Sequence, residues 1–181
     1  MAELITPTTA VRESFLAAVE EFRAEGRGTA RDSSVLGQDI AVYGRRWAEP
    51  GAFAAYVRRV VQDAAPGAPR PAGHVPSTVL WWVEGEVFLG RLSIRHRMTP
   101  RLLEWGGIIG YDVRPSARRR GHATAMLRAS LPAARRLGHD PVLLTCDWDN
   151  VASRKVIEAC GGVFEDRRGE KLRYWVPTGG T

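Results

Sequence analysis

Three consecutive arginines, Arg118 to Arg120, stand directly before Gly121 in the stretch "VRPSARRRGHAT". A strand is expected to end at Val113, and a helix is expected to begin near Gly121, with the small residue Ala123 in its first turn. Exposed N–H groups at the start of a helix attract anions, and the helix dipole adds to this attraction. The stretch therefore predicts a cradle for a pair of phosphates, with the arginine side chains supplying further positive charge.

The spacing of this stretch fits neither of two common nucleotide-binding loops. A Walker A loop requires G-x-x-x-x-G-K-[ST], and a dinucleotide-binding turn requires G-x-G-x-x-G. The stretch instead resembles the acyl-CoA signature of the GNAT superfamily of N-acetyltransferases: Arg or Gln, two residues, Gly, one residue, then Gly or Ala. Arg118, Gly121 and Ala123 occupy these places.

A second motif further along the chain strengthens the resemblance. In the same superfamily an Asn follows a strand and opens the next helix, which ends at a glycine pair or at Gly-Phe. The stretch "LLTCDWDNVASRKVIEACGGVF" supplies Asn150, Ser153, Gly161, Gly162 and Phe164 in this order. The similarity covers roughly residues 80–176. It is strongest to a bacterial subgroup of predicted acetyltransferases that carry "GGxIGYxVRPSxRRxGxAT", "TCDxDNxAS" and a terminal "RYW".

The resemblance implies an α/β (α+β) fold, namely a single-domain GNAT-like fold whose mixed twisted sheet has central splayed parallel strands flanked by helices. It implies acetyl-CoA as co-substrate and no metal. The pantetheine arm would lie between "IIGYDV" and "PVLLTCDW", with a backbone N–H near Val113 polarising the thioester carbonyl. The residues expected to bind acetyl-CoA are Val113, Arg118, Arg119, Arg120, Gly121, His122, Ala123, Thr124, Asn150 and Ser153.

The resemblance leaves the catalytic groups less determined. Many superfamily members have a Tyr seven residues after the Asn as the acid that protonates the leaving thiolate, but here that position is Ile157. Some branches have a Ser three residues after the Asn, so Ser153 is the candidate, with a bond to the helix backbone as its alternative role. Glu104, Tyr111 and Asp112 are candidates for the base that deprotonates the amine.

The acceptor is expected to be a primary amine, and a small molecule is favoured over a protein. Arg95 at a strand end and Trp105 in the loop before the cofactor strand are the candidate acceptor contacts. Few acidic residues surround the expected site, so a strongly polycationic acceptor is not favoured. The sequence leaves a homodimer open.

Alternating and helical patterns predict the elements that position these residues. Helices are expected over "TTAVRESFLAAVEEFRAEGR" and "AFAAYVRRVVQD", with no element between them up to about Val42. Residues 64–76 form a loop, and a hairpin turns at residues 84–86. "RMTPRLLEWGG" is expected to be a loop. The helix after Gly121 ends at Gly138, and Pro132 is expected to kink or break it. Two short strands close the chain.

Composition places this 181-residue chain among ordinary globular proteins and predicts one domain over residues 1–181. Residues 1–76 would form N-terminal helices and a loop, and residues 77–176 the acetyl-CoA-binding core. No apolar run approaches the roughly 20 residues of a membrane span, and no secretory signal is visible, so a cytoplasmic location is expected. The two cysteines, Cys146 and Cys160, lack the spacing of a zinc site.

Two other classes of function remain open. The net charge of +6 comes almost entirely from arginine and allows a nucleic-acid-binding module. Against this, the densest arginine cluster sits at a helix start, where one phosphate pair fits, so nucleic acid is disfavoured. The missing helix tyrosine and the uncertain base also allow a catalytically silent acyl-CoA sensor.

Overall fold

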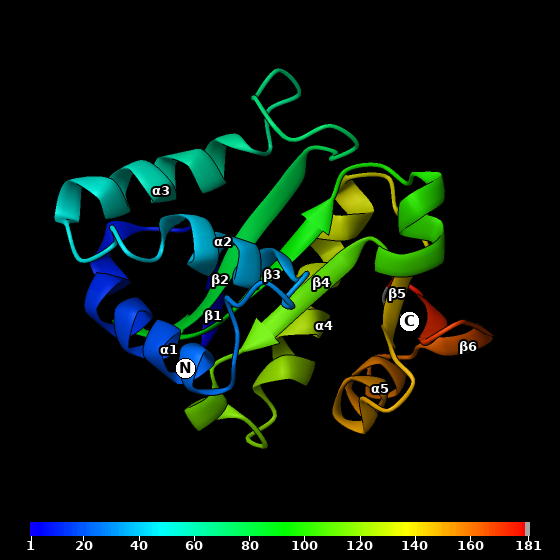
Figure 1. Ribbon diagram of the computed structural model, residues 1–181. Helices are drawn as coiled ribbons and strands as arrows, with labels where there is room; N and C mark the ends of the chain where they lie inside the picture. Colours follow the sequence, from blue (N-terminus) through cyan, green and yellow to red (C-terminus); the bar gives the residue numbers. More distant parts are fainter. Residues whose placement is uncertain (180–181) are drawn as a thin grey trace.

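A computed structural model describes residues 1–179, which form two antiparallel sheets and the helices around them (Figure 1). The first sheet has the strand order β1 (Glu3–Ile5), β2 (Ser77–Glu84), β3 (Val87–Arg95) and β4 (Ile109–Val113). The second has the order β5 (Val142–Asp147), β7 (Lys171–Val176) and β6 (Val163–Arg168). The helices are α1 (Arg12–Ala24), α2 (Val35–Tyr43), α3 (Pro50–Gln62), α4 (His122–Arg136) and α5 (Val151–Ala159).

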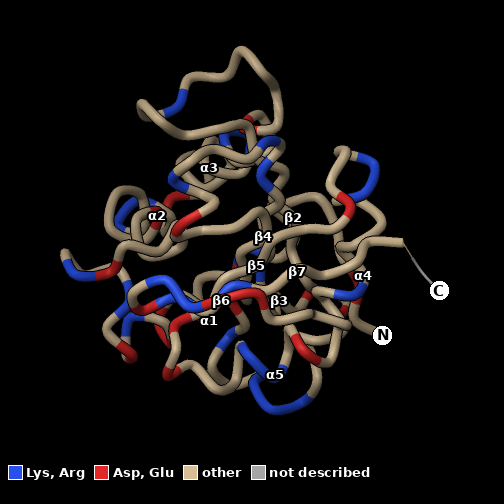
Figure 2. Tube along the Cα trace, turned by 90° about the vertical axis from the view of Figure 1, so that its right-hand side faces the viewer, with Lys and Arg blue, Asp and Glu red and all other residues tan. Residues whose placement is uncertain are grey.

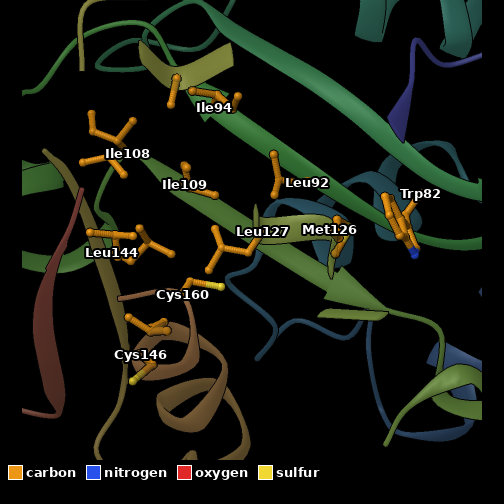
Figure 3. Packing of buried hydrophobic residues seen from close by; sticks show 14 of the residues in the cluster. Trp82, Leu92, Ile94, Ile108, Ile109, Met126, Leu127, Leu144, Cys146 and Cys160 are labelled. Carbon is orange, nitrogen blue, oxygen red and sulfur yellow. The ribbon is translucent and has the colours of Figure 1, made fainter. Parts of the chain in front are cut away.

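Helices cover both faces of the first sheet (Figure 1). Helices α1, α2 and α3 pack on one face, where Phe15, Phe53 and Trp81 belong to one buried cluster. Helix α4 packs on the other face, where Met126 and Leu127 lie against Leu92 (Figure 3). Because both faces are covered, the adjacent residues Trp81 and Trp82 are both buried, each in a different cluster.

The two sheets meet at one point, where β4 and β5 begin. The N–H of Ile108 donates to the carbonyl of Leu143 at 2.7 Å. Gly107 makes this approach feasible, because its φ is +61° and a Cβ there would lie 2.6 Å from the Leu143 oxygen. From this contact the two strands run in the same direction and diverge (Figure 1). The mixed fold with splayed parallel strands is thus confirmed.

Helix α2 is a correction to the expectation of no element before Val42. Ser34 caps the helix by accepting the N–H of Gly37 at 3.0 Å, and Leu36 and Ile40 are buried. The polar residue Asp39 breaks the hydrophobic pattern but is itself buried, because it accepts hydrogen bonds from Arg91 and Tyr56. A buried ion pair therefore replaces one apolar contact of the helix. The spacing of hydrophobic residues in the sequence could not indicate such a pair.

Two other expectations need correction. Residues 102–106, expected to be part of a loop, form a π-helical turn that we label η2 (Leu102–Gly106). Of the kink or break expected at Pro132, the break does not occur, because helix α4 is continuous through that residue. Pro132 is exposed, so the carbonyl that loses its N–H partner is on the solvent side of the helix.

The loop between α1 and α2 is organised around the Asp32 carboxylate. It accepts hydrogen bonds from Arg27 Nε at 2.9 Å, from the N–H groups of Gly28 and Ser34 at 3.0 Å, and from Ser34 Oγ at 2.6 Å. Burial alone would raise the pKa of this carboxyl, but the bonds from Ser34, Gly28 and Arg27 outweigh it and hold the pKa below its usual range.

We expect Asp32→Asn to lower the free energy of unfolding by about 1–2 kcal/mol at neutral pH, because the charged acceptor is lost. The folded pKa lies below the unfolded one, so the carboxylate stabilises the fold above about pH 4, and this stabilisation is lost as the pH falls further. Urea unfolding at pH 7 and pH 3 measures this. The difference between wild type and variant should shrink at the lower pH, whereas the exposed control Asp149→Asn should change little at either pH. An equal difference at both values would contradict the assignment.

Candidate active site

The free edge of β4 faces the space that opens toward β5. Arg114 N–H donates to the Leu89 carbonyl at 2.8 Å, and Arg95 N–H donates to the Ile108 carbonyl at 2.9 Å. In an antiparallel ladder the hydrogen-bonded pairs alternate. Residues 110 and 112 therefore also bond to β3, whereas the N–H groups of Tyr111 and Val113 point away from β3 and toward β5. The edge thus offers two backbone donors to a chain that enters the groove.

The loop after β4 presents unpaired amides at the wide end of this groove. Gly121 caps α4 with a φ of +82°, and Arg119 also has a positive φ, +60°. The first hydrogen bond into the helix is from Ala125 N–H to the Gly121 carbonyl at 3.0 Å. Within residues 1–179, the amides of residues 119–124 donate to no acceptor. Six adjacent free donors at a helix start are the arrangement that an anion-binding site requires.

The three arginines of this loop differ in what they contact. Arg118 donates through Nη1 and Nη2 to both carboxylate oxygens of Glu25, at 2.6 and 2.8 Å, and through Nε to the Val113 carbonyl at 3.1 Å. Its side chain therefore ties the loop to α1 and β4 and does not lie over the amides. Arg119 and Arg120 are exposed.

The remaining cofactor candidates in this loop lie in the first turn of α4. His122 Nδ1 accepts a hydrogen bond from Trp82 Nε1 at 3.2 Å, which positions the ring against the sheet. Ala123 and Thr124 are half-buried, and a Cβ added at Gly121 would meet no protein atom within 4 Å. The space on the Cβ side of Gly121 is therefore open.

Ser153 and Tyr111 come together across the groove. Their hydroxyl oxygens are 2.7 Å apart, although one lies in the first turn of α5 and the other on β4. Asn150 caps α5 by accepting the Ser153 N–H at 3.0 Å, as its type predicts. Burial raises the pKa of Tyr111 despite the opposing hydrogen bond with Ser153, so the phenol stays protonated at neutral pH. The side chain of Ile157 is fully buried.

Glu104 and Trp105 lie in η2, which borders the second sheet. Glu104 is ion-paired with Arg168 at the end of β6. Figure 2 shows that β6 carries both acidic and basic residues, two of each in succession. Trp105 is 58% exposed, and its carbonyl accepts a hydrogen bond from Thr145 Oγ1 at 3.1 Å. The structure thus places Glu104 in a surface ion pair, and it leaves the Trp105 ring open to contact a ligand.

Arg95 and Asp112 lie on the face of the sheet opposite Tyr111, because neighbouring residues of a strand alternate. Arg95 Nη1 donates to the carbonyls of Gly106 and Gly107 at 3.2 and 3.1 Å. Asp112 Oδ1 accepts from Nη2 of Arg27, at 2.9 Å. Arg27 thereby connects the loop between α1 and α2 to β4.

Sequence reasoning named Tyr111 and Ser153 but not their contact, and it missed Arg27. These contacts join residues 42 and 85 positions apart, with no motif between them. The one available signal was strand parity, which separates Tyr111 from Asp112. Parity does not say which helix or loop packs against each face.

A family model described as "Acetyltransferase (GNAT) domain" matches residues 35–163 of this chain. A search of curated proteins finds no match. Among the described residues 1–179, no group of three or more His, Cys, Asp or Glu could hold a metal ion. The helices in that part of the chain are too short or too polar to span a membrane.

Solved structures with similar folds include three acetyltransferases. RimJ of Mycobacterium smegmatis, in complex with CoA-disulfide, has a TM-score of 0.63 at 15% identity and covers 97% of this chain and 80% of its own. The microcin C7 self-immunity acetyltransferase MccE, with acetyl-CoA and AMP, has a TM-score of 0.62 at 11% identity, covering 97% and 92%. The ribosomal L7/L12 α-N-protein acetyltransferase RimL, with CoA, has a TM-score of 0.61 at 16% identity, covering 96% and 92%.

Proposed function

Because this chain belongs to the GNAT acetyltransferase family, we propose that it transfers an acetyl group from acetyl-CoA to a primary amine by direct attack, without an acyl-enzyme. The observation that carries this proposal is the run of free amides at residues 119–124 beside the groove between β4 and β5. Family membership supports the acyl donor. We infer the acceptor and the individual steps from the geometry of the site.

The residues present fit acetyl-CoA. The amides of residues 119–124 would hold the pyrophosphate, since they have no other acceptor and the space at Gly121 is open. Exposed Arg119 and Arg120 would screen the phosphates. The edge donors of Tyr111 and Val113 would bind the carbonyl groups of the acyl-pantetheine arm, which extends from the cradle toward the apex of the groove.

The chain's backbone would stabilise the charge that develops during transfer. As the amine nitrogen bonds to the carbonyl carbon, the carbonyl π electrons move onto oxygen. A fixed N–H on the β4 edge, as predicted for Val113, donates to that oxygen and binds it most strongly when it is negative. The C–S bond then breaks, and its electron pair leaves with the sulfur.

The hydroxyl pair of Ser153 and Tyr111 would serve the leaving thiolate. Ser153 donates its proton, or a hydrogen bond, to sulfur, while the phenol of Tyr111 donates to Ser153 Oγ. The raised pKa of Tyr111 suits a donor and makes it a poor base. The pair would thus replace the tyrosine that is absent at Ile157.

Asp112 is the best placed of the three candidates for the amine's proton. It lies next to Val113 on the face opposite Tyr111, and its Oδ2 accepts no hydrogen bond within the described residues. Both carboxylates are ion-paired, Asp112 with Arg27 and Glu104 with Arg168, but only Asp112 lies on β4 beside the edge donors. An alkylammonium has a pKa near 10 and is therefore charged at neutral pH. A carboxylate beside it would attract the ammonium and pass its proton to water.

Two measurements test the proposal together: thermal unfolding with acetyl-CoA, and release of CoA in the presence of an amine panel. At 100 times Kd, acetyl-CoA should stabilise the fold by about 2.7 kcal/mol. CoA release should require an amine. Binding without release for any amine would support a silent acyl-CoA sensor instead. If random DNA binds in a strongly salt-dependent way and acetyl-CoA does not displace it, the result would instead support a nucleic-acid-binding module.

A further inference from the structure

Arg95 is a half-buried cation without an acidic partner. No Asp or Glu of residues 1–179 lies within salt-bridge distance of its guanidinium, whereas Arg27, Arg114, Arg118 and Arg168 around the site are each ion-paired. Burial lowers the pKa of Arg95, and the charge of Arg101 lowers it further. A desolvated charge that no protein group neutralises is costly to keep. Because Arg95 lies next to the groove, its unneutralised charge points to a ligand that supplies the missing negative charge.

The donors that Arg95 leaves unused lie on one side of its guanidinium. Nη1 is occupied by the carbonyls of Gly106 and Gly107, whereas Nε and Nη2 have no acceptor within residues 1–179. Neither of these two nitrogens is among the buried polar atoms that lack a partner, so both reach solvent. Nε–H and Nη2–H form the parallel pair of an arginine fork, which matches the two oxygens of a carboxylate.

The position of Arg95 relates its guanidinium to the transfer site. Nη1 lies 3.9 Å from where a Cβ of Gly110 would stand, so the absent side chain leaves room beside the guanidinium. Gly110 and Asp112 point to the same face of β4, about 7 Å apart along the strand. The guanidinium of Arg95 and the Asp112 carboxylate, whose Oδ1 is paired with Arg27 and whose Oδ2 accepts no hydrogen bond within residues 1–179, thus border one face of the sheet, beside the edge donors of Tyr111 and Val113.

We propose that the acceptor is a small zwitterionic amine, an amino-acid-like molecule whose carboxylate binds the Nε and Nη2 side of Arg95 while its amino group faces Asp112. This inference rests on the proposed acetyl transfer and names its substrate class. Arg95 acts in specificity and positioning, because it binds the carboxylate and fixes where the nitrogen lies. The exposed ring of Trp105 is then available for the substrate's side chain.

The test is CoA release with the proteinogenic L-amino acids, each compared with its own α-carboxamide, which keeps the amine and removes the negative charge. We expect the best amino acid to exceed its carboxamide in kcat/KM by about tenfold or more, the loss expected when a charged hydrogen bond is removed. Arg95→Gln should remove this preference by raising KM for the amino acid, with little effect on the carboxamide. Arg97→Gln, which removes the same charge two residues away, should keep the preference.

The outcomes separate the two proposals. Acetyl-CoA binding measured by thermal shift should be unchanged in Arg95→Gln, since Arg95 is remote from the cradle. Two results would overturn only the assignment of Arg95 and not the proposed function. One is that the carboxamides react as well as the acids, and the other is that acetyl-CoA binds but no amino acid is acetylated. Absence of acetyl-CoA binding in the wild type would overturn the proposed function itself. Because the acid-to-amide comparison uses the wild type, it stands even if Arg95→Gln disturbs η2.

Discussion

Gly121→Val is expected to weaken acetyl-CoA binding by at least about 100-fold, whereas Arg120→Ala should weaken it by less than about fivefold. Gly121 has a φ of +82°, a conformation that costs a residue with a side chain about 1–2 kcal/mol and a β-branched residue more. Relief of that strain would turn the amides of residues 119–124 away from a common centre. Arg120 is an exposed charge, and such charges contribute up to about 1 kcal/mol.

Gly138→Val is the matched control for this prediction. Gly138 lies just beyond the other end of α4, has a φ of +89°, and likewise has no protein atom within 4 Å of its Cβ position. Both variants should lose a similar amount of thermal stability in the absence of ligand. Only Gly121→Val should lose the stabilisation by acetyl-CoA, measured by titration calorimetry or thermal shift.

Ionic strength further separates the contribution of the Arg120 charge from that of the backbone amides. The deficit of Arg120→Ala should shrink as the ionic strength rises, because exposed charges are screened, whereas the deficit of Gly121→Val should persist. Should Arg120→Ala prove the more damaging change, the amide cradle would be the wrong explanation, and a general positive patch would account for binding.

The run of free amides could be predicted from sequence because its geometry is local. A strand end, a turn and a helix start within a dozen residues determine where the amides of residues 119–124 point. The cap at Asn150 was predictable for the same reason, since its partner Ser153 is three residues away. Arg118 shows the limit, because the motif marks its position but does not indicate that its side chain binds Glu25, a residue 93 positions away.

The acceptor side depends on contacts that no local pattern encodes. Arg27 reaches Asp112 because the loop between α1 and α2 folds over β4, and that loop is shaped by the Asp32 carboxylate. Helix α2 was missed because Asp39 interrupts its apolar face, and only the fold shows that Arg91 neutralises it. Likewise, the absence of an acidic partner for Arg95 is visible only once every surrounding element is in place.

Ser153→Ala is expected to lower kcat by roughly 100-fold, a typical loss for an acid catalyst, while the Kd of acetyl-CoA changes by less than about threefold. The helix cap should survive, because Asn150 binds the backbone N–H of Ser153 and not its hydroxyl. Ser153→Thr keeps a hydroxyl at the same place and should retain most of the activity. Stopped-flow or steady-state CoA release, with calorimetric Kd values, gives the required separation.

Tyr111→Phe should produce a similar loss, and the double variant should lose little more than either single one. Two groups that act as one unit give strongly non-additive losses, so a double-mutant cycle detects the pair directly. Additive losses would mean that the 2.7 Å contact between the hydroxyls is structural only. Unchanged turnover in Ser153→Ala would exclude the serine from the chemistry.

The pH profile distinguishes a donor from a base. Turnover should rise with pH in the wild type, because the attacking amine must lose its proton, whose pKa is near 10. Burial holds the pKa of Tyr111 above that of a free phenol, so the donor pair should remain protonated across this range, and no descending limb should occur below about pH 10. Tyr111→Phe should lower the whole profile and leave its ascending limb in place. If Tyr111 were instead the base, its removal would alter that ascending limb.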